Sequence, residues 1–204
     1  FDTSGSFVAQ VRKPEAPGRI AFSPDLGIVP MSKVVANVAT IAANQLEAAG
    51  AEVTSDIPDF SGALAGFQTL RAVLLGTMMG ELLEKERDRI AEDIVGNIER
   101  GFDVTPQQLF EAERVRWALY HEMIKFFNTH DVLICPSASI SAFPVELPFV
   151  SEIDGKTCET YIDWFVITFA LTMTSCPVIS IPCGFTGDGL PVGLQVVGKP
   201  RGEA

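Results

Sequence analysis

Residue types that commonly perform catalysis are sparse in this sequence of 204 residues. Its two histidines, His121 and His130, are nine positions apart, a spacing that matches no zinc-binding motif. The four cysteines are Cys135, Cys158, Cys176 and Cys183. They form no Cys-x-x-Cys pair, and three of them lie in apolar, strand-like surroundings, which favours inert buried thiols over a Cys–His nucleophile pair. We therefore expect no metal ion and no cofactor.

A glycine-rich segment offers a second candidate for chemistry. Gly184, Gly187 and Gly189 resemble a phosphate-binding loop in composition. The segment lies between two strand-like runs, however, and no helix N-terminus follows it to hold a phosphate. The pattern instead predicts a hairpin turn.

The overall charge excludes some classes of partner. The formal net charge is −11, and a surface this acidic repels nucleic-acid backbones and anionic lipid headgroups. No charged residue lies between Asp163 and Asp188, a length that could span a membrane. Pro177 and Pro182 interrupt that run, so it predicts a buried helix followed by a buried strand. We expect a cytoplasmic protein with no direct contact to nucleic acid or membrane.

The elements that would position any site form a mixed α/β pattern. Strands are predicted at 19–22, 51–54, 131–135, 178–181 and 192–197. Helices are predicted from the residue after Ser32 to residue 49, around 67–78, around 83–98 and at 161–172. A further helix is predicted from the capping box formed by Thr105 and Gln108 to about residue 128. The first strand–helix–strand unit predicts parallel neighbours, and the glycine turn predicts that 192–197 runs antiparallel to 178–181. We expect one domain over 1–204, with an extended arm at 1–18 and a surface excursion at 136–157.

Four motifs carry a resemblance to a known family. They are Arg19-Ile-Ala-Phe-Ser-Pro-Asp-Leu-Gly27, Asp131-Val-Leu-Ile-Cys-Pro-Ser137, Thr172-Met-Thr-Ser-Cys-Pro-Val-Ile-Ser-Ile-Pro-Cys-Gly-Phe185 and Gly189-Leu-Pro-Val-Gly-Leu-Gln-Val-Val-Gly198. Together they closely resemble the C-terminal half of the amidase signature family. The resemblance implies an α/β/α sandwich whose mixed sheet is flanked by helices. It also implies hydrolysis of a carboxylic amide to an acid plus ammonia or an amine.

The same resemblance implies where the catalytic groups lie. In that family a serine nucleophile, a second serine in a cis peptide and a lysine form the relay, and backbone N–H groups hold the oxyanion. These parts belong to the family's N-terminal half, and Ser4 and Ser6 lack the glycine-rich flank and the upstream lysine. The first residue is Phe1, and the last residues follow a strand-like run directly, which favours a C-terminal portion of a longer amidase. We expect no catalytic residue here and no activity from this chain alone.

The resemblance further implies that this half supplies a wall of the substrate pocket. Tyr161, Phe165, Thr168 and Thr172 fall on one helical face at spacings of four, three and four. Related tRNA-dependent enzymes carry an aspartate near the position of Phe165 and an asparagine at that of Thr172. Phenylalanine and threonine here favour an apolar or aromatic amide, whereas the alternative is that the four residues are ordinary core. For Gln195 a structural hydrogen bond is expected.

Two other assignments stay open, and they concern partners as well as activity. One is the A subunit of a tRNA-dependent amidotransferase, and the other is a non-catalytic module of a split amidase. The expected partners are a small-molecule amide and the missing N-terminal half of the same protein. Self-association is also expected, through the arm at 1–11 or the face at 161–172, because an uncovered sheet edge attracts further strands.

Overall fold

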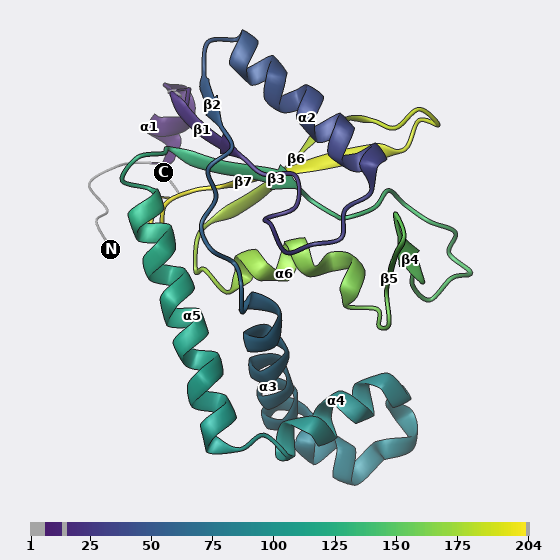
Figure 1. Cartoon of the computed structure of the whole chain (residues 1–204). Helices are drawn as coiled ribbons and strands as arrows, with labels where there is room; N and C mark the ends of the chain where they lie inside the picture. Colours follow the sequence, from purple (N-terminus) through teal and green to yellow (C-terminus); the bar gives the residue numbers. More distant parts are fainter. Residues whose placement is uncertain (1–6, 14–15, 203–204) are drawn as a thin grey trace. The chain divides into compact units, whose positions relative to one another are not determined.

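A five-stranded mixed sheet organises the computed structural model, which describes residues 7–13 and 16–202 (Figure 1). Its order is β2-β1-β3-β7-β6. The strands are β1 Arg19–Phe22, β2 Glu52–Thr54, β3 Val132–Pro136, β6 Val178–Phe185 and β7 Pro191–Val197. Strand β1 is parallel to β2 and β3, while β7 is antiparallel to both β3 and β6. The predicted mixed sheet and both predicted pairings are confirmed.

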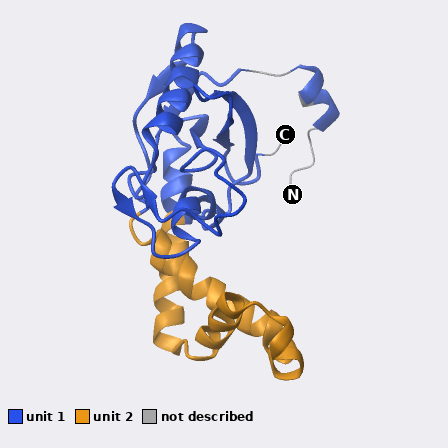
Figure 2. Ribbon diagram, turned by 90° about the vertical axis from the view of Figure 1, so that its right-hand side faces the viewer, with its two compact units in different colours: residues 1–60, 120–204 blue, residues 61–119 orange. Residues whose placement is uncertain are grey.

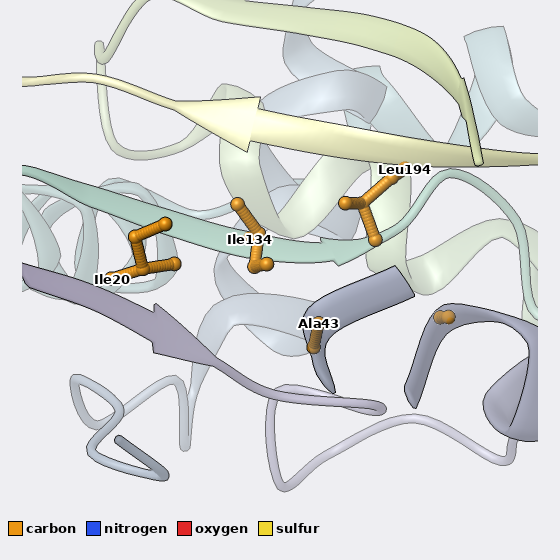
Figure 3. Close-up of a cluster of buried hydrophobic side chains, with 5 residues drawn as sticks. Ile20, Ala43, Ile134 and Leu194 are labelled. Atoms are coloured by element: carbon orange, nitrogen blue, oxygen red, sulfur yellow. The ribbon is translucent and has the colours of Figure 1, made fainter. Parts of the chain in front are cut away.

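One face of the sheet packs on helix α2, Lys33–Ala48. Ile20, Ile134 and Leu194 point from β1, β3 and β7 toward this helix and are almost fully buried (Figure 3). The helix meets them with Ala39 and Ala43, whose small side chains allow a close approach. This cluster is the core on the α2 side of the sheet.

The other face is covered by helix α6, Val166–Thr172 (Figure 1). Side chains alternate along a strand, so Gln195 on β7 points away from the Leu194 side. Its amide reaches the carbonyl oxygen of Ile167 in α6 at 3.5 Å. Helices therefore lie on both faces of the sheet, which agrees with the predicted α/β class.

Residues 61–119 form a second compact unit that is helical (Figure 2). It contains α3 Ala63–Glu86, the 3-10 turn η1 Arg87–Arg89, α4 Glu92–Phe102 and α5 Pro106–Phe126 as far as Leu119. Small residues bring α3 and α4 together: Gly101 of α4 lies against Ala72 and Gly76 of α3. The remaining described residues form the unit that contains the sheet. The expectation of one domain over 1–204 stays a prediction.

Two predicted helix boundaries are wrong. One helix is predicted around 67–78 and a second around 83–98. In the structure the first of these helices, α3, continues to Glu86, and the break before the second lies at η1. The run Glu84–Glu86 consists of good helix formers and gives no signal to stop. At 161–172, α6 begins only at Val166, after the 3-10 turn η2 Asp163–Phe165. The carboxylate of Asp163 accepts backbone N–H groups of two preceding residues at 2.8 Å and closes a turn there.

The cap of α2 also differs from the expectation. Ser32 makes no side-chain capping hydrogen bond. The first N–H of the helix, that of Lys33, instead donates to a carboxylate oxygen of Asp154 at 2.7 Å. Asp154 lies in the turn between two short strands, β4 Glu152–Ile153 and β5 Lys156–Thr157. A carboxylate at a helix N-terminus satisfies an unpaired donor and complements the helix dipole.

The predicted surface excursion and arm have mixed structures. The excursion at 136–157 has no helix and ends in the β4–β5 hairpin, whose turn residues Asp154 and Gly155 both have positive φ. Within the predicted arm, Phe7–Arg12 forms helix α1, while Ser4 and Ser6 lie outside the described residues. Among the helices that the structure describes, none combines the length and the apolar character needed to cross a bilayer.

Candidate substrate-binding site

The four residues predicted to line a pocket lie in and just before α6. Tyr161 and Phe165 precede the helix, are partly buried, and have ring centroids 6.1 Å apart. Phe165 also packs edge-on against Phe169, with centroids 5.9 Å apart. Thr168 and Thr172 are exposed on the helix itself. The structure therefore brings the two aromatic side chains together and leaves the two threonines at the protein surface.

A hydrogen-bond network fixes α6 to the end of β3. The Gln195 amide nitrogen donates to the carbonyl oxygens of Pro136 at 3.1 Å and of Ile167 at 3.5 Å. The residues that follow Ile167 and Pro136 are joined as well: the Thr168 hydroxyl donates to the carbonyl oxygen of Ser137 at 3.1 Å. Two consecutive residues of α6 are thus tied to two consecutive residues at the exit of β3. The structural hydrogen bond expected for Gln195 is present.

A pair of serine hydroxyls lies beside this junction. The Oγ atoms of Ser137, just after β3, and Ser180, on β6, are 2.6 Å apart. They meet across β7 at Gly193, where a Cβ atom would lie 2.8 Å from one hydroxyl oxygen and 3.1 Å from the other. Glycine is therefore required at this position for the two hydroxyls to meet. Ser180 is exposed and Ser137 is partly buried.

Sequence reasoning did not single out this pair as a site. Both serines stand in the motifs that carry the family resemblance, but their motifs are separated by some forty residues. The contact between the two serines depends on the strand register, which the sequence does not give. In the structure the Ser137 N–H donates to the Gly193 carbonyl, and Pro182 of β6 pairs with Gly193 from the other side. A predicted order of β3-β7-β6 with a glycine in the middle strand would have indicated the contact.

The cysteines are poor nucleophiles in this structure. Burial raises the pKa of the Cys135 thiol to about 12, although a weak contact from the Gln195 amide opposes the shift. Burial also raises the pKa of each of the other three thiols. Thiolates are therefore scarce at neutral pH, and the thiolate is the reactive form. This agrees with the expectation of inert thiols.

The contacts of the His130 ring indicate a structural role. Its two ring nitrogens are 3.0 Å and 3.1 Å from the hydroxyls of Thr54 and Thr129, and its ring stacks on Phe126 at a centroid distance of 4.4 Å. Within residues 7–13 and 16–202, no three His, Cys, Asp or Glu side chains are grouped so that they could hold a metal ion. The side chains that form hydrogen bonds between α6 and the sheet include the Thr168 hydroxyl and the Gln195 amide, both of which are uncharged. The α6 surface can donate and accept hydrogen bonds, and the aromatic side chains offer apolar area.

Comparison with known proteins gives the wider context. The chain is 28% identical over 189 residues to an acylamidase of Rhodococcus erythropolis, a match that covers 91% of this chain and 39% of that protein. It is 29% identical over 159 residues to the A subunit of the glutamyl-tRNA(Gln) amidotransferase of Listeria monocytogenes, covering 74% and 30%. The chain therefore spans about two-fifths or less of the length of these relatives.

The fold has solved counterparts. A bacterial aryl acylamidase of the amidase signature family superimposes with a TM-score of 0.82 at 19% identity, covering 97% of this chain and 43% of that one. The A subunit of the glutamyl-tRNA(Gln) amidotransferase of Thermotoga maritima superimposes less closely, with a TM-score of 0.61 at 19% identity, covering 91% and 39%. The family model described as Amidase matches residues 1–204. The chain therefore belongs to the amidase signature family.

Proposed function

We propose that this chain forms one wall of the substrate pocket of an amidase that hydrolyses a carboxylic amide. The observation that carries the proposal is the surface at the start of α6, where the Tyr161–Phe165 aromatic pair precedes exposed Thr168. Apolar surface with a few placed polar groups is typical of small-molecule sites. The surface belongs to a chain of the amidase signature family.

The catalytic groups of the proposed amidase lie outside this chain. A serine nucleophile needs a base within hydrogen-bond reach, and the family uses a Ser–cis-Ser–Lys relay. Among the described residues, the hydroxyls of Ser137 and Ser180 contact each other and no lysine or histidine. The curated acylamidase relative extends well beyond the match, since the chain covers 39% of it. That extra length offers room for a relay and an oxyanion hole.

The proposed substrate is an apolar or aromatic amide. Phe165 stands where related tRNA-dependent enzymes carry a carboxylate, and here it packs among aromatic rings. The bacterial aryl acylamidase has the higher TM-score of the two solved relatives described above. The amidotransferase component is the second candidate, because its Listeria counterpart matches over 74% of this chain. Co-purification of a tRNA-binding companion protein with the natural protein would favour that second candidate.

The exposed edge of the sheet at β6 supports two proposed partners, the remainder of the same protein and further copies of this chain. Strand β6 is at the edge, and its Val178, Ile179, Ile181 and Phe185 side chains are 40%, 61%, 40% and 69% exposed. An edge with apolar side chains attracts a further strand. We propose that the remainder of the protein covers it, and that the isolated chain, lacking that cover, self-associates in the cytoplasm. Sedimentation velocity of the 204-residue chain should show species larger than a monomer, and a strict monomer at high concentration would contradict the proposal.

An activity comparison tests the proposed function. The natural protein that contains this chain should release aniline from acetanilide, and the 204-residue chain alone should release none. Losing one oxyanion donor typically costs about a hundredfold or more in rate, and here the relay is absent as well. Turnover by the isolated chain that Ser137→Ala or Ser180→Ala abolishes would contradict the proposal.

A further inference from the structure

The Ser137–Ser180 pair presents an unused hydrogen-bond donor at the protein surface. In a pair of hydroxyls 2.6 Å apart, one hydroxyl donates its proton to the other oxygen. The second hydroxyl then has a proton of its own to donate. Within the described part of the chain, neither Oγ atom has another hydrogen-bond partner. One O–H group is therefore directed to whatever occupies the space beside it.

The surroundings hold this donor in a fixed place. Ser137 is fixed through its backbone, because its N–H donates to Gly193 at 2.8 Å and its carbonyl accepts from Thr168 at 3.1 Å. Ser180 is held on β6 by the strand pairing with β7. Two different elements thus bring their hydroxyls together over a glycine, with α6 alongside. A donor held by backbone contacts loses little entropy when a ligand binds.

We propose that the Ser137–Ser180 pair is a subsite for a neutral hydrogen-bond acceptor of the substrate, a carbonyl oxygen in its acyl or amine portion. The inference rests on the proposed function, which makes the adjoining α6 surface a pocket wall. A hydroxyl is uncharged, and no charged side chain is bonded to the pair among the described residues. The subsite therefore selects a carbonyl over an apolar group of the same shape, because an apolar group would leave the donor unpaired.

The test uses two pairs of matched anilides with the natural protein that contains this chain. One pair is N-(4-acetylphenyl)acetamide and N-(4-ethylphenyl)acetamide, and the other is 4-oxopentananilide and pentananilide. The preference for the carbonyl compound is the ratio of the two kcat/KM values. Comparing this ratio between wild type and variant cancels the intrinsic reactivity of the substrates. We expect the double variant Ser137→Ala/Ser180→Ala, which removes both hydroxyls of the pair, to lower the ratio for at least one pair of substrates by about 3- to 10-fold, the loss of one net hydrogen bond.

Two further variants separate a lost hydrogen bond from a damaged fold. Ser180→Thr keeps a hydroxyl on β6 and should retain the wild-type preference. Ser151→Ala removes an exposed serine hydroxyl before β4 and should leave both ratios unchanged. Unchanged ratios for both substrate pairs in Ser137→Ala/Ser180→Ala would overturn the subsite.

A binding measurement keeps the subsite distinguishable from the proposed function. If the wild-type protein hydrolyses none of the anilides, the proposed function fails. The affinity for N-(4-acetylphenyl)acetamide, measured by calorimetry, then decides on the subsite alone. Weaker binding to Ser137→Ala/Ser180→Ala than to wild type supports the subsite. Equal binding to both proteins, or no binding to wild type, overturns it.

Discussion

Replacing Gln195 by methionine should loosen the attachment of α6 to the sheet. Gln195 is 5% exposed, and its amide nitrogen joins the carbonyl oxygens of Pro136 and Ile167. Methionine has a similar volume and adapts to irregular gaps, so the substitution creates little cavity. It removes the side-chain donor that bonds both carbonyl oxygens. The expected cost is therefore electrostatic and not one of packing.

The distances set the size of the effect. The 3.1 Å bond to Pro136 is within the normal range, whereas the 3.5 Å contact to Ile167 is at its limit. One good bond lost in a buried site costs about 1–3 kcal/mol, so we expect a loss of about 2 kcal/mol in the free energy of unfolding. With an m-value of about 2 kcal/mol per M, the urea midpoint should fall by about 1 M.

The assay is urea unfolding followed by tryptophan fluorescence. Trp164 lies beside Phe165, with ring centroids 5.3 Å apart, so its emission reports on the α6 region. Gln45→Met on the exposed side of α2 is the matched control, and its effect should stay within about 0.5 kcal/mol. If Gln195→Met and Gln45→Met unfold at the same urea concentration, the network does not hold α6 and the reasoning fails.

Two other perturbations have clear directions. The pKa of Asp131 is lowered by hydrogen bonds from two backbone N–H groups at the start of β1, so its stabilising effect is present above about pH 4 and is lost as pH falls through the lowered pKa. Asp131→Asn should thus destabilise the protein at pH 7, and the difference in melting temperature from wild type should shrink as the pH falls below about 4. A difference that stays constant with pH would argue against the carboxylate. In α4, a methyl group at Gly101 would overlap the Ala72 carbonyl oxygen, whereas one at Gly96 meets nothing within 4 Å. Gly101→Ala should therefore lower the melting temperature, while Gly96→Ala should keep or raise it because alanine favours helix by about 1 kcal/mol; equal melting temperatures would contradict the close α3–α4 packing.

Features formed by residues close together in the sequence could be predicted from the sequence alone. The capping box at the start of α5 is present: the Thr105 N–H donates to the Gln108 side chain at 2.9 Å, and the Gln108 N–H donates back to the Thr105 hydroxyl at 3.3 Å. The β6–β7 pairing likewise follows from a short glycine-containing turn between two apolar runs. Both features involve residues close in sequence, so periodicity and turn chemistry suffice to predict them.

Features that join distant residues could not be predicted in the same way. The cap of α2 comes from Asp154, 121 positions from the N–H group that it accepts. A local reading assigns the cap to Ser32, the nearest suitable side chain, because no sequence pattern indicates where a remote loop folds back. The Ser137–Ser180 pair likewise depends on the register of three strands. The sequence thus pointed to the candidate site at α6 but gave no sign of the serine pair beside it.

The most direct test of the pocket-wall proposal is Phe165→Asp in the natural protein that contains this chain. A carboxylate among the rings of Tyr161, Trp164 and Phe169 costs a few kcal/mol unless a cationic substrate group neutralises it. The measurement compares kcat/KM for acetanilide and for an amino-acid anilide with a free α-amine, in wild type and in a folded variant. If Phe165 lines the pocket, activity on acetanilide falls while the relative activity on the amine-bearing substrate rises. If both activities fall by the same factor, Phe165 is core and the pocket-wall assignment is wrong.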